Sequence, residues 1–394
     1  MARSIGLVVK TNELRSIQYY NRTLKSLGVA ARVWLRTRIS RARRQNLLTN
    51  GSSLIAQMLQ ATLTGKVPVW LSAGLDDLIV EDGRVVGVQV TKDGEKTRIQ
   101  ARLGVLLAAG GFARNPEMRH KYSGDQPNDG TWTFSNAGDT GEALQTAMRL
   151  GAKTDLMDEA WWLPSALAPA LAGSTLSQGR QRPGTMLVNS AAKRFVNESN
   201  SYVEVGKAMY ANGGVPAWLI FDDAYRRRYV NTQPLPGRLP KEWVDSGALK
   251  KSDTIEGLAG QTELDPAVLR QTVDHFNTHA RQGKDPDFRR GESAYNKCLG
   301  DPGYKLNPAV GPIDKGPYYA LQIVPADVGT CGGLITNEHA QVLDDADQPI
   351  PGLYATGNIT ATVMGRHYLG AGASIANSMV FGFVAARHAA NVKG

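Results

Sequence analysis

The sequence predicts an α/β fold in which a discontinuous first domain carries an inserted second domain. Three glycine-rich clusters stand at expected strand ends or helix starts: AAGGF at 108–112, GDTGE at 138–142, and YATGN with YLGAG at 354–358 and 368–372. Open α/β sheets bind ligands beyond the carboxyl ends of their strands, so these clusters predict the walls of one cofactor site. The stretch from about 160 to 328 is rich in tryptophan, proline and loops, which places the insertion there.

The elements of the first domain follow from periodicity and turn residues. Apolar spacing predicts an amphipathic helix over 52–64. Strand-like runs at 67–72, 78–80, 85–90 and 97–101, with Asp-Gly turns at 82–83 and 93–94, predict a small antiparallel meander. The apolar run 104–111 ends in Gly-Gly and predicts a buried parallel strand that stops at a ligand. Residues 1–45 yield no clear assignment.

Three helices have identifiable ends. Over 138–152, Asp139 or Thr140 is expected to cap the helix start and Gly151 to end the helix. Asp265 and Pro266 predict the start of a helix within the insertion. A Gly/Ala-rich helix is expected over 373–391. We therefore divide the chain into 1–160 and 329–394, the two parts of the first domain, and 161–328, an inserted α+β domain.

Composition and charge exclude several classes of protein. The 394 residues are 42% hydrophobic and 21% charged, unlike a disordered chain or a coiled coil. The two cysteines, Cys298 and Cys331, lack CxxC or Cys/His spacing, so we expect no disulfide framework, no metal site and a cytoplasmic protein. No apolar run approaches the ~18 residues of a membrane span.

The net charge of +9 is concentrated in one segment. Its arginines are Arg32, Arg36, Arg38, Arg41, Arg43 and Arg44. Such a run fits nucleic acid, an anionic membrane, or a solvated helix face or linker. Trp34 is its single aromatic residue and no nucleic-acid motif accompanies it, so we favour the solvated face and expect no nucleic-acid partner.

Several motifs together resemble a known family. They are LLAAGGFARN, GDTGE, RFVNES, GPYYALQI, GTCGGLITN and IPGLYATGN. The set resembles the FAD-dependent fumarate reductase/succinate dehydrogenase flavoprotein superfamily, over about residues 50–394. The C-terminal stretch from Gly352 is more similar still to 3-ketosteroid Δ1-dehydrogenases. The resemblance implies a glutathione-reductase-type FAD-binding domain, here discontinuous and N-terminally incomplete, with an inserted substrate domain that carries catalytic residues.

The resemblance also implies which residues bind FAD. The implied contacts are Ala109 and Gly110 at the nucleotide half, Asp139, Gly357 and Asn358 near the ribityl or pyrophosphate, and Ala373, Ser374 and Ile375 at the flavin pyrimidine edge. A helix start at the last position suits a reduced flavin, because its N–H groups stabilise negative charge. The alternative is that these small residues only permit close packing of helices on strands.

Three further residues are implied to act on the substrate. In the ketosteroid enzymes a tyrosine and the backbone N–H four residues later bind the C3 carbonyl, and these positions are Tyr368 and Gly372 here. Tyr202 matches the tyrosine that removes a proton next to that carbonyl. Tyr202 is otherwise an ordinary amphipathic tyrosine, and a phenol of pKa ~10 is a poor base unless its neighbours lower that value.

The reacting positions favour a neutral substrate. Fumarate reductases have an arginine where Tyr368 stands and a histidine before the Gly-Gly, whereas Gly329 and Thr330 offer no cation for a carboxylate. We therefore expect FAD-dependent dehydrogenation of a 3-ketosteroid-like ketone to the enone. Trp161, Trp162 and Trp218 could line an apolar slot for the steroid, or they could belong to the core. The alternatives are another flavin oxidoreductase substrate, including fumarate-type acids, or an inactive fragment. The electron acceptor is not indicated.

The sequence departs from the family pattern in three places. Leu369 replaces a proline, and His367, for which we favour a packing role, precedes the tyrosine. A further family tyrosine has only Tyr19, Tyr20 and Tyr122 as stand-ins. The sequence contains no GxGxxG, and we expect its absence to weaken FAD binding and to leave a sheet edge and an apolar face uncovered.

Overall fold

The computed structural model describes residues 7–45, 47–124, 129–167, 179–229, 237 and 239–391, and divides into two compact units between Leu71 and Ser72. The first unit is helical: η1 (Thr11–Glu13), α1 (Leu14–Gln18), α2 (Leu24–Ala42) and α3 (Asn50–Thr64). Helix α3 confirms the amphipathic prediction. Most of the arginine run lies on α2, where Arg36 pairs with Glu13 and the Arg32 and Arg38 side chains are exposed.

The predicted strand at 67–72 is wrong. Among the described residues this segment pairs with no strand, and Leu71 is 77% exposed. The meander itself is confirmed, as β1 (Ala73–Glu81), β2 (Arg84–Lys92) and β3 (Glu95–Gln100) pair in that order. Both Asp-Gly turns adopt positive φ, at Asp82 (49°) and Gly83 (75°) and again at Asp93 and Gly94, as two-residue hairpins require. The Asp-Gly turns therefore set the positions of the hairpins, whereas the apolar segment at 67–72 has no strand to pair with and stays irregular.

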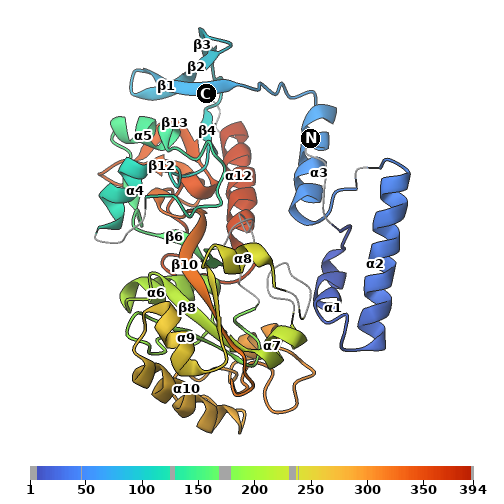
Figure 1. Cartoon of the computed structure of the whole chain (residues 1–394). Helices are drawn as coiled ribbons and strands as arrows, with labels where there is room; N and C mark the ends of the chain where they lie inside the picture. The colour runs from blue at the N-terminus through green and yellow to red at the C-terminus, as the bar shows by residue number, and fades with distance from the viewer. Residues whose placement is uncertain are drawn as a thin grey trace. The chain divides into compact units, whose positions relative to one another are not determined.

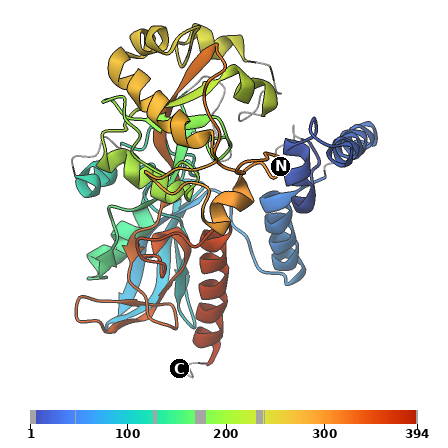
Figure 2. The ribbon, with the colours of Figure 1, turned by 90° about the horizontal axis from the view of Figure 1, so that it is seen from below.

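A second three-stranded sheet joins the two ends of the larger unit. Its order is β12 (Gln341–Leu343), β13 (Pro349–Ala355) and β4 (Val105–Leu107), with β4 parallel to β13 and at the edge. The predicted parallel strand is present but ends at Leu107, so 108–111 lies beyond the sheet. The predicted burial is wrong in part, because Leu106 is 40% exposed at this sheet edge. Helix α12 (Ala373–Asn391), predicted with these bounds, lies along this sheet (Figure 2). Its outer face leaves Phe383 63% exposed.

Helix α5 (Glu142–Arg149) packs Leu144 into the core shared by the meander and this sheet. Its predicted cap is wrong, because Gly141 is the N-cap, at φ 83°, and no side chain caps the helix. Asp139 is instead turned toward Gly110. The predicted stop is confirmed, as Gly151 follows the C-cap at φ 83°. Helix α4 (Pro116–Ser123) completes this region.

The largest sheet lies in the middle of the chain. Its order is β6 (Ala160–Ala166), β10 (Tyr318–Thr330), β8 (Ala217–Asp222) and β7 (Thr185–Val188), with β9 (Leu249–Ser252) also on β10. Helices α9 (Ile255–Thr262) and α10 (Pro266–Ala280) cover one face (Figure 1). Asp265 caps α10 as predicted, accepting from the N–H groups of Ala267 and Val268.

The shorter elements connect these layers. They are β5 (Thr154–Asp155), α6 (Tyr202–Ala211), α7 (Asp223–Arg228), α8 (Lys241–Asp245), α11 (Ala294–Leu299), β11 (Gly333–Leu334) and η2 (Gly357–Ile359). Strand β10 runs through the boundary placed at 328/329, and the division into 1–160, 161–328 and 329–394 stays a prediction. Among the described helices, none combines the length and the hydropathy that crossing a bilayer requires.

Candidate functional site

Two of the predicted residues meet directly. Tyr202 is the first residue of α6, which Ser201 caps by accepting from the N–H of Glu204. Tyr368 lies in the irregular loop between η2 and α12. The two hydroxyl groups are hydrogen-bonded, and the ring centroids are 4.8 Å apart with an interplanar angle of 45°. Two phenols from distant segments therefore converge on one point, where a single substrate oxygen or carbon could contact both.

The walls around the tyrosine pair are apolar. Trp161 of β6 presents an edge to Tyr368, with ring centroids 5.7 Å apart, and its Nε1 donates to Oδ1 of Asn358 at 3.0 Å. The surrounding buried residues are Ala160, Trp162, Val203 and Cys331, with Tyr210 and Met364 packed against them. Such a wall suits an apolar ligand that carries few polar groups.

Burial dominates the acid–base chemistry of this cluster. Loss of water, together with the hydrogen bond that Tyr202 donates to Tyr368, raises the pKa of Tyr202 well above its usual range. A general base needs the opposite shift, so the resting pair holds Tyr202 as a neutral phenol. Burial, with Glu159 nearby, likewise raises the pKa of the Cys331 thiol, which keeps it protonated and a poor nucleophile.

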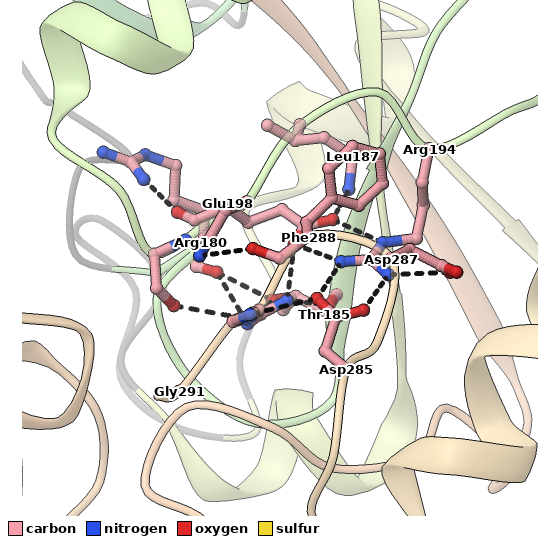
Figure 3. Close-up of polar contacts among 12 residues, drawn as sticks. Arg180, Thr185, Leu187, Arg194, Glu198, Asp285, Asp287, Phe288 and Gly291 are labelled. Atoms are coloured by element: carbon pink, nitrogen blue, oxygen red, sulfur yellow. Dashed lines mark hydrogen bonds and ion pairs between the residues drawn. The ribbon is translucent and has the colours of Figure 1, made fainter. Parts of the chain in front are cut away.

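A buried ion network underlies the start of α6 (Figure 3). Glu198 is fully buried and pairs with Arg194 at 2.9 Å and with Arg290 at 3.0 Å. Burial opposes ionisation of Glu198, but the two guanidinium groups outweigh it and hold its pKa below the usual range. Arg194 also pairs with Asp285 at 2.8 Å, which links the RFVNES segment to a distant loop.

Arg180 and Arg290 also donate to backbone carbonyls in the segment from Arg180 to Asn200, ahead of Tyr202. Arg180 donates through Nη1 to the carbonyls of Glu198 and Asn200, the latter at 3.0 Å (Figure 3). Burial lowers the pKa of Arg180 to about 10. Arg290 donates to the carbonyls of Arg180 and Thr185 at 2.9 and 2.6 Å. The approach to Tyr202 is therefore fixed by buried, charge-assisted hydrogen bonds, which are stronger than neutral ones.

The glycine clusters form a groove beside this site. Gly110, at φ 81°, lies so close to Asp139 that a Cβ there would approach its Oδ1 to 2.4 Å. Burial raises the pKa of Asp139. A groove of about 310 Å³ is lined by Ala73, Gly74, Leu75, Ala109, Gly110, Gly138, Gly141, Glu142 and Ala143. The exposed backbone of these glycines and the half-buried carboxyl group of Asp139 suit a ligand whose hydroxyl groups approach the main chain.

Gly111 joins the groove to the tyrosine site. A Cβ on Gly111 would stand 2.0 Å from Oγ1 of Thr330 and 3.0 Å from the carbonyl of Asn358. Thr330 Oγ1 also accepts from the N–H of Phe112 at 3.2 Å. Asn358 in turn reaches Trp161 beside Tyr368. The segments at 109–111, 330 and 357–358 are thus neighbours in one continuous site.

The start of α12 supplies free donors. Gly357, at φ 80°, lies against Ser378 of this helix. The N–H of Ala373 donates to Gly370, whereas those of Ser374 and Ile375 lie in the first turn, where a helix offers no acceptor of its own. The amide oxygen of Asn377 is buried with no hydrogen-bond partner in the structure. These N–H donors and this amide oxygen fit the edge of a polar ring that carries both acceptors and an N–H group, so the residues present suit FAD.

Known proteins share this sequence pattern. The family described as "FAD binding domain" matches residues 14–375. A 3-oxosteroid 1-dehydrogenase of Mycolicibacterium smegmatis is 41% identical over 397 residues, which cover 97% of this chain and 69% of that protein. The chain belongs to this family of FAD-binding flavoproteins.

Solved structures agree with that assignment. The flavoprotein matches the 3-ketosteroid Δ1-dehydrogenase of Sterolibacterium denitrificans, solved with 1,4-androstadiene-3,17-dione, at a TM-score of 0.90 and 38% identity, over 97% of this chain and 71% of that one. A 3-ketosteroid Δ4-(5α)-dehydrogenase of Rhodococcus jostii RHA1, solved with 4-androstene-3,17-dione, matches at 0.64 and 26% identity, over 84% and 62%. These matches confirm the predicted α/β flavoprotein fold, FAD as cofactor and an FAD-dependent oxidoreductase.

Several residues raised by the sequence lie elsewhere in the flavoprotein. Trp218 packs in the core under α9 and α10, away from the tyrosine cluster. Tyr122 packs against Phe112, with ring centroids 5.8 Å apart, and Tyr19 and Tyr20 belong to the other unit. His367 is exposed, so the packing role favoured for it is wrong. The Trp161–Asn358 hydrogen bond was missed, because nothing in the sequence marks that pairing.

Proposed function

We propose that this flavoprotein removes two hydrogens, at C1 and C2, from a 3-ketosteroid that already has a C4–C5 double bond, to give the 1,4-dienone. The observation that carries the proposal is the hydrogen-bonded pair of Tyr202 and Tyr368 in an apolar wall. The relatives described above support it, since two act on 3-oxosteroids at position 1 and their identities are 41% and 38%. The apolar and aromatic residues packed around the pair suit a neutral ketone better than a dicarboxylate.

Different residues of the chain act on the substrate carbonyl and on the neighbouring C–H bond. In this proposal, Tyr368 and the N–H of Gly372 donate to the substrate C3 oxygen, and each such donor is typically worth ~3 kcal/mol of transition-state stabilisation. Polarising the carbonyl acidifies the neighbouring C2–H bond. Tyr202 takes that C2 proton on its phenolic oxygen. Bound FAD supplies the acceptor for the hydride that leaves C1.

The positions of these residues in the chain support this division of roles. Tyr368 stands four residues before Gly372, and α12 begins at the next residue, so carbonyl donors and helix start are neighbours in the chain. In our assignment Ala109, Gly110, Asp139, Gly357, Asn358, Ala373, Ser374 and Ile375 hold the cofactor. With these assignments, the substrate ring lies between the residues that hold the flavin and the pair of Tyr202 and Tyr368.

We also infer a cytoplasmic location and an apolar steroid-sized substrate. Cys298 and Cys331 are both free thiols in the structure, which supports a reducing compartment. Dyes and quinones offered to the reduced protein test which acceptor takes its electrons.

The decisive experiment is an assay of the FAD-loaded chain. With 4-androstene-3,17-dione and an artificial electron acceptor, we expect 1,4-androstadiene-3,17-dione, identified by mass and by the C1–C2 olefinic protons in NMR. A saturated 5α-3-ketosteroid is the positional control, because a Δ4 dehydrogenase would introduce the double bond at C4–C5. Formation of a C4–C5 double bond in the saturated control, or turnover of fumarate instead of steroid, would contradict the proposal.

A further inference from the structure

The loop that carries Tyr368 has little rigidity of its own. It runs between Thr362 and Ala373 without helix or strand. Gly365, Gly370 and Gly372 all have positive φ, at 60°, 137° and 95°, and glycine loses more conformational freedom on folding than any other residue. Something outside the loop must therefore set the position of the Tyr368 hydroxyl.

Arg366 supplies ionic contacts to that loop. Its Nη1 lies 2.7 Å from Oδ2 of Asp158 and 2.7 Å from Oε1 of Glu159, and its Nη2 lies 3.0 Å from Oδ1 of Asp158. The carbonyl of Arg366 accepts from Nζ of Lys207. In the described part of the chain, the hydrogen bonds that tie residues 363–369 to other segments come from Arg366 and Tyr368.

The partners of Arg366 belong to the two elements that build the site. Glu159 directly precedes β6, which carries Trp161, and Lys207 lies on α6, which begins at Tyr202. Lys207 and Glu159 are themselves paired at 3.1 Å. The side chain of Glu159 is 8% exposed and that of Arg366 is 52% exposed. These paired side chains therefore extend from the buried start of β6 to the surface.

We propose that Arg366, Asp158, Glu159 and Lys207 form an ion cluster that positions Tyr368 against Tyr202. The cluster joins the tyrosine loop to β6 and to α6 at once, so it fixes the separation of the two hydroxyl groups. Arg366 acts through Tyr368 and touches no reacting atom, which makes it a positioning residue. The inference rests on the proposed function, since it concerns the same pair of phenols.

The chemistry requires a planar guanidinium at this place. Arg366 reaches two carboxylates in different directions, and a lysine ammonium cannot reproduce that forked geometry. An error of about 1 Å in placing a reacting group can cost up to ~100-fold in rate. Substituting Arg366 is therefore expected to lower kcat by roughly 10- to 100-fold and to leave KM within about threefold.

The experiment compares Arg366→Met and Arg366→Lys with Arg270→Met in the full chain. Arg270 forms a similarly exposed forked pair with Glu256, at 2.7 and 3.0 Å, between α9 and α10. We expect kcat to fall for Arg366→Met, to recover in part for Arg366→Lys, and to stay unchanged for Arg270→Met. Thermal unfolding shows whether each variant is folded. If Arg366→Met unfolds, Asp158→Asn removes the outer charge and serves as the second variant.

A second readout needs neither steroid nor turnover. The chain is labelled with 3-fluorotyrosine, and the ¹⁹F resonances of positions 202 and 368 are assigned with Tyr202→Phe and Tyr368→Phe. We expect Arg366→Met to move both resonances and Arg270→Met to move neither. Unmoved resonances together with an unchanged kcat would overturn the cluster's role. A wild-type chain that does not oxidise the steroid would contradict the proposed function instead.

Discussion

Tyr202 and Tyr368 share a hydrogen bond between their hydroxyl groups, and burial raises the pKa of Tyr202. A phenol in this state donates readily and accepts a proton poorly. Tyr202 donates to the Tyr368 oxygen, which leaves the Tyr368 proton available to the carbonyl of a bound ketone. At the scale of single residues, the neutral tyrosine pair is therefore suited to polarise a carbonyl by hydrogen bonding. Proton removal depends on the small fraction of Tyr202 that is ionised.

The raised pKa of Tyr202 predicts that kcat/KM rises with pH. The proton acceptor is the deprotonated form of Tyr202, and its raised pKa means that the fraction ionised grows about tenfold per pH unit well below that pKa. We expect kcat/KM for 4-androstene-3,17-dione to increase from about pH 7 to about pH 10 without a plateau. The measurement is a pH–rate profile of the wild type beside Tyr202→Phe, whose residual rate should lack the rise. A wild-type plateau below about pH 9 would show that another group is the base.

Which residues the sequence could predict depended on how local their signals are. The Asp-Gly hairpins, the Asp265 cap and the bounds of α12 follow from nearby residues, and the structure confirms them. The cap of α5 was misjudged because Asp139 faces Gly110 across the groove. The Arg366 cluster could not have been predicted, since its members come from three segments that only folding brings together.

At the scale of elements, the start of α6 depends on the buried network around Glu198. Leu187 of β7 donates its N–H to Glu198 at 3.0 Å, so the carboxylate also holds a strand. Arg290 reaches three backbone carbonyls, those of Arg180, Arg182 and Thr185. These contacts connect β7, the segment before it and the loop at 285–290 to the residue that precedes Tyr202 by four positions.

Glu198→Gln is expected to destabilise the fold strongly. Removing one member of a buried ion pair typically costs about 3–5 kcal/mol in the free energy of unfolding, because the remaining charges lose their partner. The folded-state pKa of Glu198 is held below its unfolded value, so its contribution is present above about pH 4.3 and is lost as pH falls through the folded pKa. Denaturant unfolding of the variant at neutral and acid pH measures both effects.

Glu256→Gln is the matched control, because it breaks the exposed pair with Arg270. Its unfolding midpoint should stay close to that of the wild type. If Glu198→Gln unfolded at the same denaturant concentration as this control, the network would not support α6 in the way described.

At the scale of the whole molecule, the site is assembled from segments far apart in the chain. Residues 109–111, 139, 330, 357–358 and the start of α12 border one another only after β4 has paired with β13. A ligand that contacts all of them binds the folded state and not the unfolded chain. FAD should therefore act as a cross-link between these segments.

FAD is expected to raise the thermal unfolding midpoint. At a concentration a hundred times Kd, the stabilisation is about 2.7 kcal/mol for one site. Gly111→Ala should weaken this effect, because its Cβ would stand 2.0 Å from Thr330 Oγ1. Gly260→Ala on α9 is the control, since a Cβ there meets nothing within 4 Å. Equal FAD-dependent shifts in the two variants would show that the junction at Gly111 does not border the cofactor.

The most direct test of the tyrosine pair is the turnover of Tyr368→Phe. The change removes one hydroxyl and keeps the ring that packs against Trp161. We predict that the FAD-loaded variant oxidises 4-androstene-3,17-dione about 100-fold or more slowly than the wild type, as loss of an oxyanion donor does elsewhere. A variant that folds, binds FAD and keeps the wild-type rate would contradict the claim that Tyr368 holds the carbonyl oxygen.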